Sequence, residues 1–146
     1  MIPFEEARRI ILENAKPLGV ARRSLRTLRG LVLAETVYAA FDLPRFNNSA
    51  VDGFGVKVAD LQAASPDNPV TLELVDTIQA GDSRKVSIRA GEAIKILTGA
   101  PVPTSVEAVV MQEFTEQCAD GRVRFFRATQ SGEHIRRKGE EFKKGQ

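Results

Sequence analysis

The chain has 146 residues, a formal net charge of +2, 42% hydrophobic and 27% charged residues, one cysteine and one histidine. These values are typical of an ordinary globular chain with one domain or two small ones, and they argue against a disordered chain or a membrane chain. A single cysteine excludes a disulfide framework and a multi-cysteine zinc site, and a single histidine excludes a pair of histidine ligands.

Hydrophobic patterning argues against a membrane location. No apolar run approaches the roughly 20 residues that a membrane-spanning helix needs. The N-terminal segment carries Glu5, Glu6, Arg8 and Arg9 where a signal peptide would need an uninterrupted apolar stretch. We therefore predict a cytoplasmic protein that contacts no membrane.

Helical patterning is confined to the N-terminal part of the chain. Phe4, Ala7, Ile10 and Ile11 recur at helical spacing, so we predict an amphipathic helix over residues 3–15. A second, short helical piece is predicted over residues 24–29, before Gly30.

Short β-branched runs separated by turn signals follow from residue 31 onward. Strands are predicted within residues 31–39, 53–61, 70–79, 84–90, 93–99, 107–116 and 122–130. The expected fold class is α+β, with an N-terminal helix and a β-rich linker domain that is barrel-like or sandwich-like. The expected domains are an N-terminal helical segment of domain I over 1–45, the linker domain over 46–130, and a return segment to domain I over 131–146.

Basic residues gather in two places, and each has two interpretations. Arg22, Arg26 and Arg29 fall at helical spacing, which indicates either a solvated helix face or a phosphate site. The C-terminal "IRRKGEEFKKGQ" is open to the same two interpretations. Nucleic-acid binding by a small barrel is disfavoured, because there is no tryptophan and because Phe125 and Phe126 would point to opposite faces of a strand.

The segment "RFNNSAVDGFGV", residues 45–56, crowds small polar side chains into one loop. Asn47, Asn48 and Ser49 are residues that bond to their own backbone in turns, and Gly53 permits unusual backbone angles. A tight turn is one interpretation. The Asp52 carboxylate could also be a base, a metal ligand or a cap.

A second loop, "LTGAPVP" at residues 97–103, places Thr98 and Gly99 before two prolines that fix φ. Such a rigid loop can orient a hydroxyl and a backbone amide, or it can be a plain connector in which Thr98 bonds its own backbone. It is not a phosphate-binding P-loop, because the Gly-Lys-Ser/Thr element is missing. Farther on, Glu140 and Glu141 could bind a hard cation or could simply be solvated.

Three blocks together carry a family resemblance. "DLPRFNNSAVDGFGV" resembles the signature LPxFDNSAMDGYAV, "AGEAIKILTGAPVPTSVEAVVMQE" resembles PGEAVRIMTGAPVPxGADAVVxxE, and "SGEHIRRKGEEFKKG" resembles GxNIRxxGEDIxxG. In this order and spacing they resemble the N-terminal and linker region of the molybdopterin molybdenumtransferases, the bacterial MoeA and gephyrin E-domain family. The resemblance covers nearly the whole chain.

The resemblance implies an enzyme of molybdenum cofactor biosynthesis that inserts molybdate into adenylylated molybdopterin, assisted by Mg²⁺, with release of AMP. It implies catalytic roles for Asp52, Thr98 and Glu141, with Asp52 and Glu141 as candidate Mg²⁺ ligands. The substrate-binding residues implied by position or by the chemistry of the matching loops are Asn48, Ser49, Gly99, Arg136 and Arg137.

The family pattern also sets expectations about partners. Its members are elongated homodimers, so we expect a homodimer or a partner chain that supplies a molybdate- and pterin-binding domain, for which this sequence has no counterpart. Without that domain the chain is expected to lack the full site, and a non-catalytic dimerisation or docking module is the alternative. The sequence departs from the pattern at Asn47, Val51, Gly55, Glu141 and Thr104–Val106.

Overall fold

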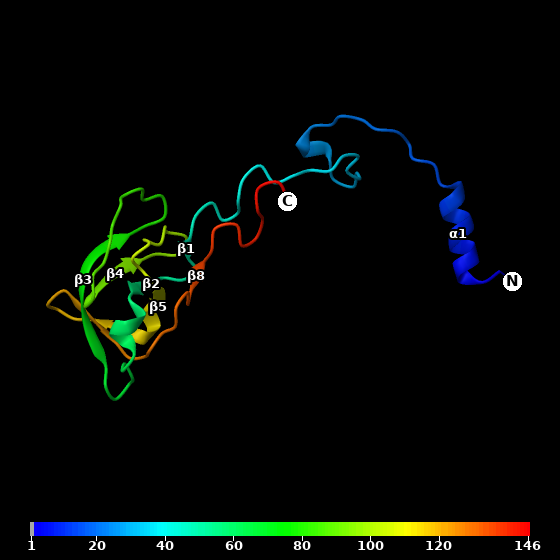
Figure 1. Ribbon diagram of the computed structural model, residues 1–146. Coiled ribbons are helices and arrows are strands. Elements are labelled where there is room, and N and C mark those ends of the chain that lie inside the picture. The colour runs from blue at the N-terminus through cyan, green and yellow to red at the C-terminus, as the bar shows by residue number, and fades with distance from the viewer. Residues whose placement is uncertain (1) are drawn as a thin grey trace. The chain divides into compact units, whose positions relative to one another are not determined.

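A computed structural model describes residues 2–146 (Figure 1). The chain divides into two compact units, Met1–Val37 and Tyr38–Gln146. No helix within the described residues is long and apolar enough to cross a membrane.

The first unit contains one helix, α1 (Phe4–Asn14), and one 3₁₀ turn, η1 (Leu25–Thr27). Glu5 and Glu6 lie in the first turn of α1, where negative charge is favourable next to the free backbone N–H groups. These elements match the helices predicted over 3–15 and 24–29. None of residues 2–37 is buried, so the apolar face of α1 is exposed, with Phe4 77% and Ile11 68% accessible.

The second unit is built on a six-stranded sheet with the order β5-β2-β4-β3-β7-β6 (Figure 1). Neighbouring strands are antiparallel except β3 and β4, which are parallel. The strands are β2 (Gly53–Val56), β3 (Val70–Ile78), β4 (Glu92–Ile96), β5 (Ala108–Met111), β6 (Thr115–Gln117) and β7 (Arg122–Phe125). The 3₁₀ turn η2 (Val58–Leu61) follows β2.

The two edge strands of this sheet, β5 and β6, are consecutive in the chain. Only the 3₁₀ turn η3 (Gln112–Phe114) separates them. Three residues in this conformation advance the chain by roughly 6 Å, so the edges must lie close together. The sheet is therefore curled into a partly closed barrel, in agreement with the predicted β-rich, barrel-like domain.

Apolar side chains form two clusters on the two faces of the curled sheet. The inner cluster is centred on Phe54 and Phe125, whose rings meet edge to face with centroids 6.0 Å apart. The outer cluster, which includes Ile94, Ile96 and Val109, lies on the opposite face and is completed by Ile88 and Val106 from loops. Alternation along β4 separates the two clusters, since Ala93 belongs to the inner one and Ile94 to the outer one.

A narrow antiparallel ribbon extends from the sheet to the C-terminus (Figure 1). Its regular part pairs β1 (Asn48–Ser49) with β8 (Ile135–Arg136). The pairing continues as a bridge between Leu43 and Phe142 and as hydrogen bonds between Ala39 and the last two residues. The C-terminal return segment therefore pairs with residues 39–49.

Two predicted strands are absent among the described residues. Residues 31–39 are not in a strand, because no ladder forms along the segment, where only Ala39 is hydrogen-bonded to the C-terminal residues, and because its apolar side chains stay largely exposed. Residues 84–90 form a loop instead of a strand. Ile88 is still buried there, and its N–H is satisfied by the hydroxyl of Ser105, which replaces a ladder hydrogen bond.

Candidate functional site

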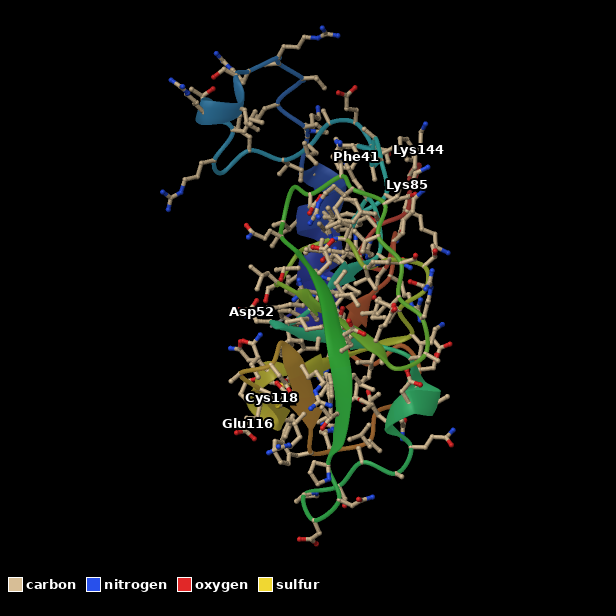
Figure 2. All side chains as sticks on the ribbon, turned by 90° about the vertical axis from the view of Figure 1, so that its left-hand side faces the viewer. Phe41, Asp52, Lys85, Glu116, Cys118 and Lys144 are labelled. Carbon is tan, nitrogen blue, oxygen red and sulfur yellow. The ribbon has the colours of Figure 1, made fainter. Side chains whose placement is uncertain are left out.

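The sheet brings together the two loops that carry the predicted catalytic residues. Asp52 directly precedes β2 and Thr98 follows β4, and these strands are antiparallel neighbours. The backbone N–H and the hydroxyl of Thr98 both donate to Oδ1 of Asp52, each at 2.7 Å. Both side chains are exposed, and Figure 2 shows Asp52 at the side of the sheet. The structure therefore joins Asp52 and Thr98 in one site.

The loop geometry behind this contact is fixed by backbone hydrogen bonds between the same two segments. The N–H of Gly99 donates to the carbonyl of Ser49 at 2.8 Å, and the N–H of Ser49 donates to the carbonyl of Ala100 at 3.0 Å. Gly99 has φ of 79°, which is the left-handed region that glycine adopts readily. The rigid "TGAP" turn is thus held against the Asn48–Ser49 strand.

Hydrogen bonding shifts the acidity of the Asp52 carboxyl group. The hydroxyl of Thr98 contributes most and the N–H of Thr98 next, and both lower the pKa of Asp52 below its ordinary value. Partial burial acts in the opposite direction, and the positive charge of Lys95 lowers the pKa further. Asp52 is therefore ionised at neutral pH. Its Oδ2 atom has no hydrogen-bond donor among residues 2–146 and is directed at no internal partner.

Three of the predicted substrate-binding residues lie in the scaffold of this loop pair. Ser49 is fully buried, and its hydroxyl donates to the carbonyl of Val51 at 2.6 Å. The N–H of Gly99 is used by Ser49, as described above. Asn48 is 9% exposed, and its Oδ1 is buried without a donor among the described residues. A buried acceptor without a partner is uncommon in proteins.

The two predicted arginines lie on the ribbon beside these residues. Arg136 is paired directly with Asn48 in the β1–β8 ladder, and Arg137 follows it. Both side chains are exposed. Neither guanidinium forms an ion pair within residues 2–146, so both are available to an external anion.

Glu141 lies elsewhere on the ribbon. Its N–H donates to the carbonyl of Leu43 at 2.9 Å. Glu141 is thus five residues farther along the chain than Arg136, which pairs with Asn48. Figure 2 shows Phe41 and Lys144 together at the far end of the ribbon, away from Asp52. No contact among the described residues joins Glu141 to Asp52, so the structure does not bring these two acids together, and a role for Glu141 stays a prediction.

A Mg²⁺ site made of protein alone is not present in the part of the chain that the structure describes. No group of three or more His, Cys, Asp or Glu side chains converges there. Mg²⁺ is, however, commonly bound through one or two carboxylates together with substrate phosphates and water. The free Oδ2 of Asp52 fits that mode, because an exposed, ionised carboxylate offers one oxygen ligand.

The departures from the family pattern are accommodated without loss of backbone contacts. Oδ1 of Asn47 accepts a hydrogen bond from the N–H of Lys138 at 2.9 Å, and an aspartate oxygen in its place could do the same. Val51 packs against the outer apolar cluster. Ser105 contributes the hydroxyl that accepts from Ile88.

Two residues of special chemistry lie outside the site. Cys118 is partly exposed in the turn between β6 and β7. Nδ1 of His134 lies 2.9 Å from the carbonyl oxygen of Val109 and donates to it in the tautomer that satisfies this acceptor, while the backbone of His134 has φ of 56°. This histidine anchors the return segment to β5.

Sequence reasoning did not single out Lys95. Its charge acts on Asp52. In the sequence, however, Lys95 is simply a polar residue within a strand, which is common at the water-facing positions of a sheet. The signal that finds it is the strand register, because Lys95 pairs with Phe54, two residues after Asp52.

Comparison with protein families gives one match that spans the described chain. Residues 2–146 match the family model described as the MoeA N-terminal region, domains I and II. The chain is also similar to molybdopterin molybdenumtransferase 2 of Mycobacterium tuberculosis, with 37% identity over 145 residues. It is 39% identical over 144 residues to the molybdopterin molybdenumtransferase of Staphylococcus epidermidis.

A solved structure agrees with these sequence relatives. The molybdopterin biosynthesis MoeA protein from Pyrococcus horikoshii OT3 has 33% identity and a TM-score of 0.83, with 100% of this chain and 38% of that chain covered. The two sequence relatives are each matched over 99% of this chain, which covers 36% of the Mycobacterium protein and 34% of the Staphylococcus protein. The chain thus spans about a third of the length of these relatives.

Proposed function

Because the chain belongs to the MoeA N-terminal region family, we propose that it acts in molybdenum cofactor biosynthesis as part of a molybdopterin molybdenumtransferase. The whole enzyme would insert molybdate into adenylylated molybdopterin and release AMP. This chain would supply one wall of the active site, and the molybdate- and pterin-binding domain would come from elsewhere in the assembly.

The observation that carries the proposal is the contact between Asp52 and Thr98. Two hydrogen bonds from one residue fix the carboxylate and keep it ionised, with one oxygen free. Both residues stand in the two loops that match the family signatures. A fixed, charged, accessible carboxylate is suited to holding a cation or orienting a water molecule next to a phosphate group.

Asp52 would be the residue of this chain that holds Mg²⁺. Mg²⁺ held there together with the substrate would supply positive charge to the phosphate oxygens and so would assist cleavage of the adenylate. Thr98 would act as the residue that orients Asp52, because its own donors are both used on the carboxylate. Glu141 is kept as a second candidate for Mg²⁺ or substrate contact on the ribbon.

Two of the remaining residues would bind the anionic substrate, and the other three would support the site. Arg136 and Arg137 would offer guanidinium groups to phosphate oxygens, since both are exposed and form no ion pair with any residue that the structure describes. Asn48, Ser49 and Gly99 would shape the backbone on which Asp52 and Thr98 are held. Asn48 would also present an acceptor that lacks an internal donor.

The decisive experiment uses a chimera in which residues 2–146 replace the matching region of the Mycobacterium tuberculosis relative. The chimera is expressed in cells that lack their own molybdenum-insertion enzyme, and nitrate reductase activity reports cofactor production. Asp52→Asn should lower that activity by about 100-fold or more. The matched control is Asp120→Asn, because Asp120 is an exposed aspartate that pairs with Arg122 on the β6–β7 turn and has no contact with Asp52 among the described hydrogen bonds and ion pairs.

The outcomes separate cleanly. Loss of activity in Asp52→Asn with normal activity in Asp120→Asn supports the proposal. Normal activity of Asp52→Asn in soluble, folded protein would remove Asp52 from the catalytic machinery and overturn it.

A second candidate is a non-catalytic dimerisation or docking module, and one observation favours it. The first unit leaves its apolar side chains exposed, including Phe4, Ile11 and Leu12 on α1. Exposed apolar faces of this kind usually mark an interaction surface. Light scattering on the purified chain tests it, and a dimer that dissociates on changing Phe4 and Ile11 to Ser would support this function. We expect such a dimer in the cytoplasm, as homodimer or with a partner chain.

A further inference from the structure

Lys95 lies on β4 beside the start of β2 and the loop that carries Asp52. Lys95 is paired with Phe54, and side chains at directly paired positions of antiparallel strands point to the same face. Asp52 directly precedes β2 and is two residues before Phe54. Three residues after Lys95, Thr98 donates both of its hydrogen bonds to Asp52.

The environment of Lys95 changes sharply along its side chain. Its neighbour Phe54 is only 2% exposed and belongs to the inner apolar cluster, whereas Asp52 and Thr98 are exposed. Lys95 itself is half-buried. A lysine at such a boundary packs its methylene groups on the apolar side and keeps its ammonium group at the water. The charge of Lys95 therefore lies at the end of the sheet where Asp52 and Thr98 are.

No carboxylate within the described part of the chain forms an ion pair with Lys95. Asp52 feels the charge of Lys95 but is held by Thr98 instead. The fold thus keeps this cation and this anion in one region of the sheet without an ion pair between them.

This arrangement fits a bound oxyanion. A lone carboxylate repels phosphate and molybdate, and the positive charge of an unpaired ammonium group that acts on the same region offsets that repulsion. Lysine is a common point-charge partner of phosphate groups. On the other side of Lys95, the parallel strand β3 places Thr77, a small polar residue, in register with it.

We propose that Lys95 is a further substrate-binding residue of the Asp52–Thr98 site, where its ammonium group contacts a tetrahedral oxyanion, either a phosphate group or molybdate. The inference rests on the proposed function, since that function places such an anion next to Asp52. It concerns a strand residue that neither of the catalytic loops contains.

The test is an anion titration of the full chain followed by backbone amide NMR. AMP, inorganic phosphate and molybdate are titrated separately into wild type, Lys95→Met, Lys95→Arg and the control Lys85→Met. Met keeps the apolar stem of Lys95 and removes only the charge, so the barrel should stay folded. Lys85 is an exposed lysine that Figure 2 places away from Asp52.

We expect the amides of Asp52, Lys95 and Thr98 to shift in the wild type and in Lys85→Met. Lys95→Met should weaken binding by about tenfold, and Lys95→Arg should bind within a few-fold of the wild type. Shifts with AMP and phosphate identify the adenylate phosphate as the ligand, and shifts with molybdate alone identify the metal oxyanion. Equal binding by Lys95→Met and wild type, or no shift near Asp52 with any anion, overturns the inference.

The two proposals can fail separately. If Asp52→Asn abolishes cofactor production in the chimera while Lys95→Met binds anions normally, the proposed function stands and the role of Lys95 falls. If Asp52→Asn is fully active while Lys95→Met loses anion binding, the anion site stands without the proposed function.

Discussion

Thr98 donates two hydrogen bonds to a single oxygen of Asp52, one from its backbone and one from its hydroxyl, both at 2.7 Å. The two residues are 46 positions apart in the chain. Each hydrogen bond favours the ionised form of Asp52, because a donor binds a charged carboxylate oxygen more strongly than an oxygen of the neutral carboxyl group. The pair is the best-defined polar contact between the two loops that carry the family signatures.

Removing the hydroxyl of Thr98 should raise the pKa of Asp52 toward the ordinary aspartate value. Thr98→Val keeps the side-chain shape and the backbone donor but deletes the stronger of the two contributions. The carboxyl carbon of Asp52, followed by NMR during a pH titration, reports the change. Thr98→Ser is the control, because it retains the hydroxyl and should leave the titration near that of the wild type. An unchanged pKa in Thr98→Val would contradict the assigned cause.

Two glycines of β2 should tolerate alanine very differently. A Cβ on Gly53 would lie 2.1 Å from the backbone oxygen of Val110, so Gly53→Ala must disrupt the pairing of β2 with β5. A Cβ on Gly55 would lie 2.7 Å from Cδ1 of Ile96, a movable methyl group. We expect a loss of about 3 kcal/mol or more for Gly53→Ala and of about 1–2 kcal/mol for Gly55→Ala, measured by urea unfolding.

The cause of the Gly55 effect can be isolated with a double mutant. Ile96→Val removes the Cδ1 methyl group that a Cβ on Gly55 would meet first. Gly55→Ala combined with Ile96→Val should therefore cost less than the sum of the two single changes. Strict additivity would show that the clash with Val106, whose methyl groups lie 3.0 Å away, decides the cost instead.

Glu133 should make the stability of the barrel depend on acid pH. Burial raises the pKa of Glu133, but hydrogen bonds from the hydroxyl of Thr129 and the N–H of Gln130, together with the charge of Arg127, lower it more. The net result is a folded-state pKa below the ordinary value of 4.5. A carboxyl group with a lowered pKa stabilises the fold above its unfolded pKa, and that contribution disappears as the pH falls through the folded pKa.

Glu133→Gln should therefore lower the free energy of unfolding at pH 7 by about 1–2 kcal/mol and should have little effect near pH 3. The measurement is urea unfolding of both proteins at several pH values. Glu116→Gln is a suitable control, because the Glu116–Arg124 pair is exposed and should contribute little. A pH-independent difference between Glu133→Gln and the wild type would argue against this linkage.

Deletion of residues 1–37 should leave the second unit folded. All members of both apolar clusters belong to the second unit, so the deletion removes none of them. The shortened chain, residues 38–146, should melt within about 2 °C of the full chain by circular dichroism. Deletion of residues 132–146 is the contrasting control, because it removes β8 and the Glu133 network. Loss of cooperative unfolding in the 38–146 chain would show that the first unit supports the barrel.

Sequence periodicity located the elements that carry a strong local pattern. The helix over 3–15 and the strands within 70–79, 93–99 and 122–130 are present in the structure. The segment 31–39 has the same β-branched composition and forms no strand, because a strand also needs a neighbour with free backbone groups. Local composition says nothing about that neighbour.

In the candidate site, too, local motifs identified some residues, whereas others depend on tertiary contacts. Asp52 and Thr98 were chosen from loop motifs, and the structure brings them into contact. Glu141 was chosen with them, and no contact among the described residues joins it to Asp52. Lys95 was not chosen, because a lysine in an alternating strand gives no signal until its partner strand is known.

By itself, the sequence determined the α+β class, the positions of most elements and the loops that carry the family signatures, because local propensity and turn chemistry are encoded in neighbouring residues. Only the tertiary structure decided that Thr98 fixes Asp52, that Lys95 is paired with Phe54 beside their loops, and that Glu141 lies on the ribbon. Those relationships follow from strand register, in which a shift of one residue turns every side chain to the opposite face.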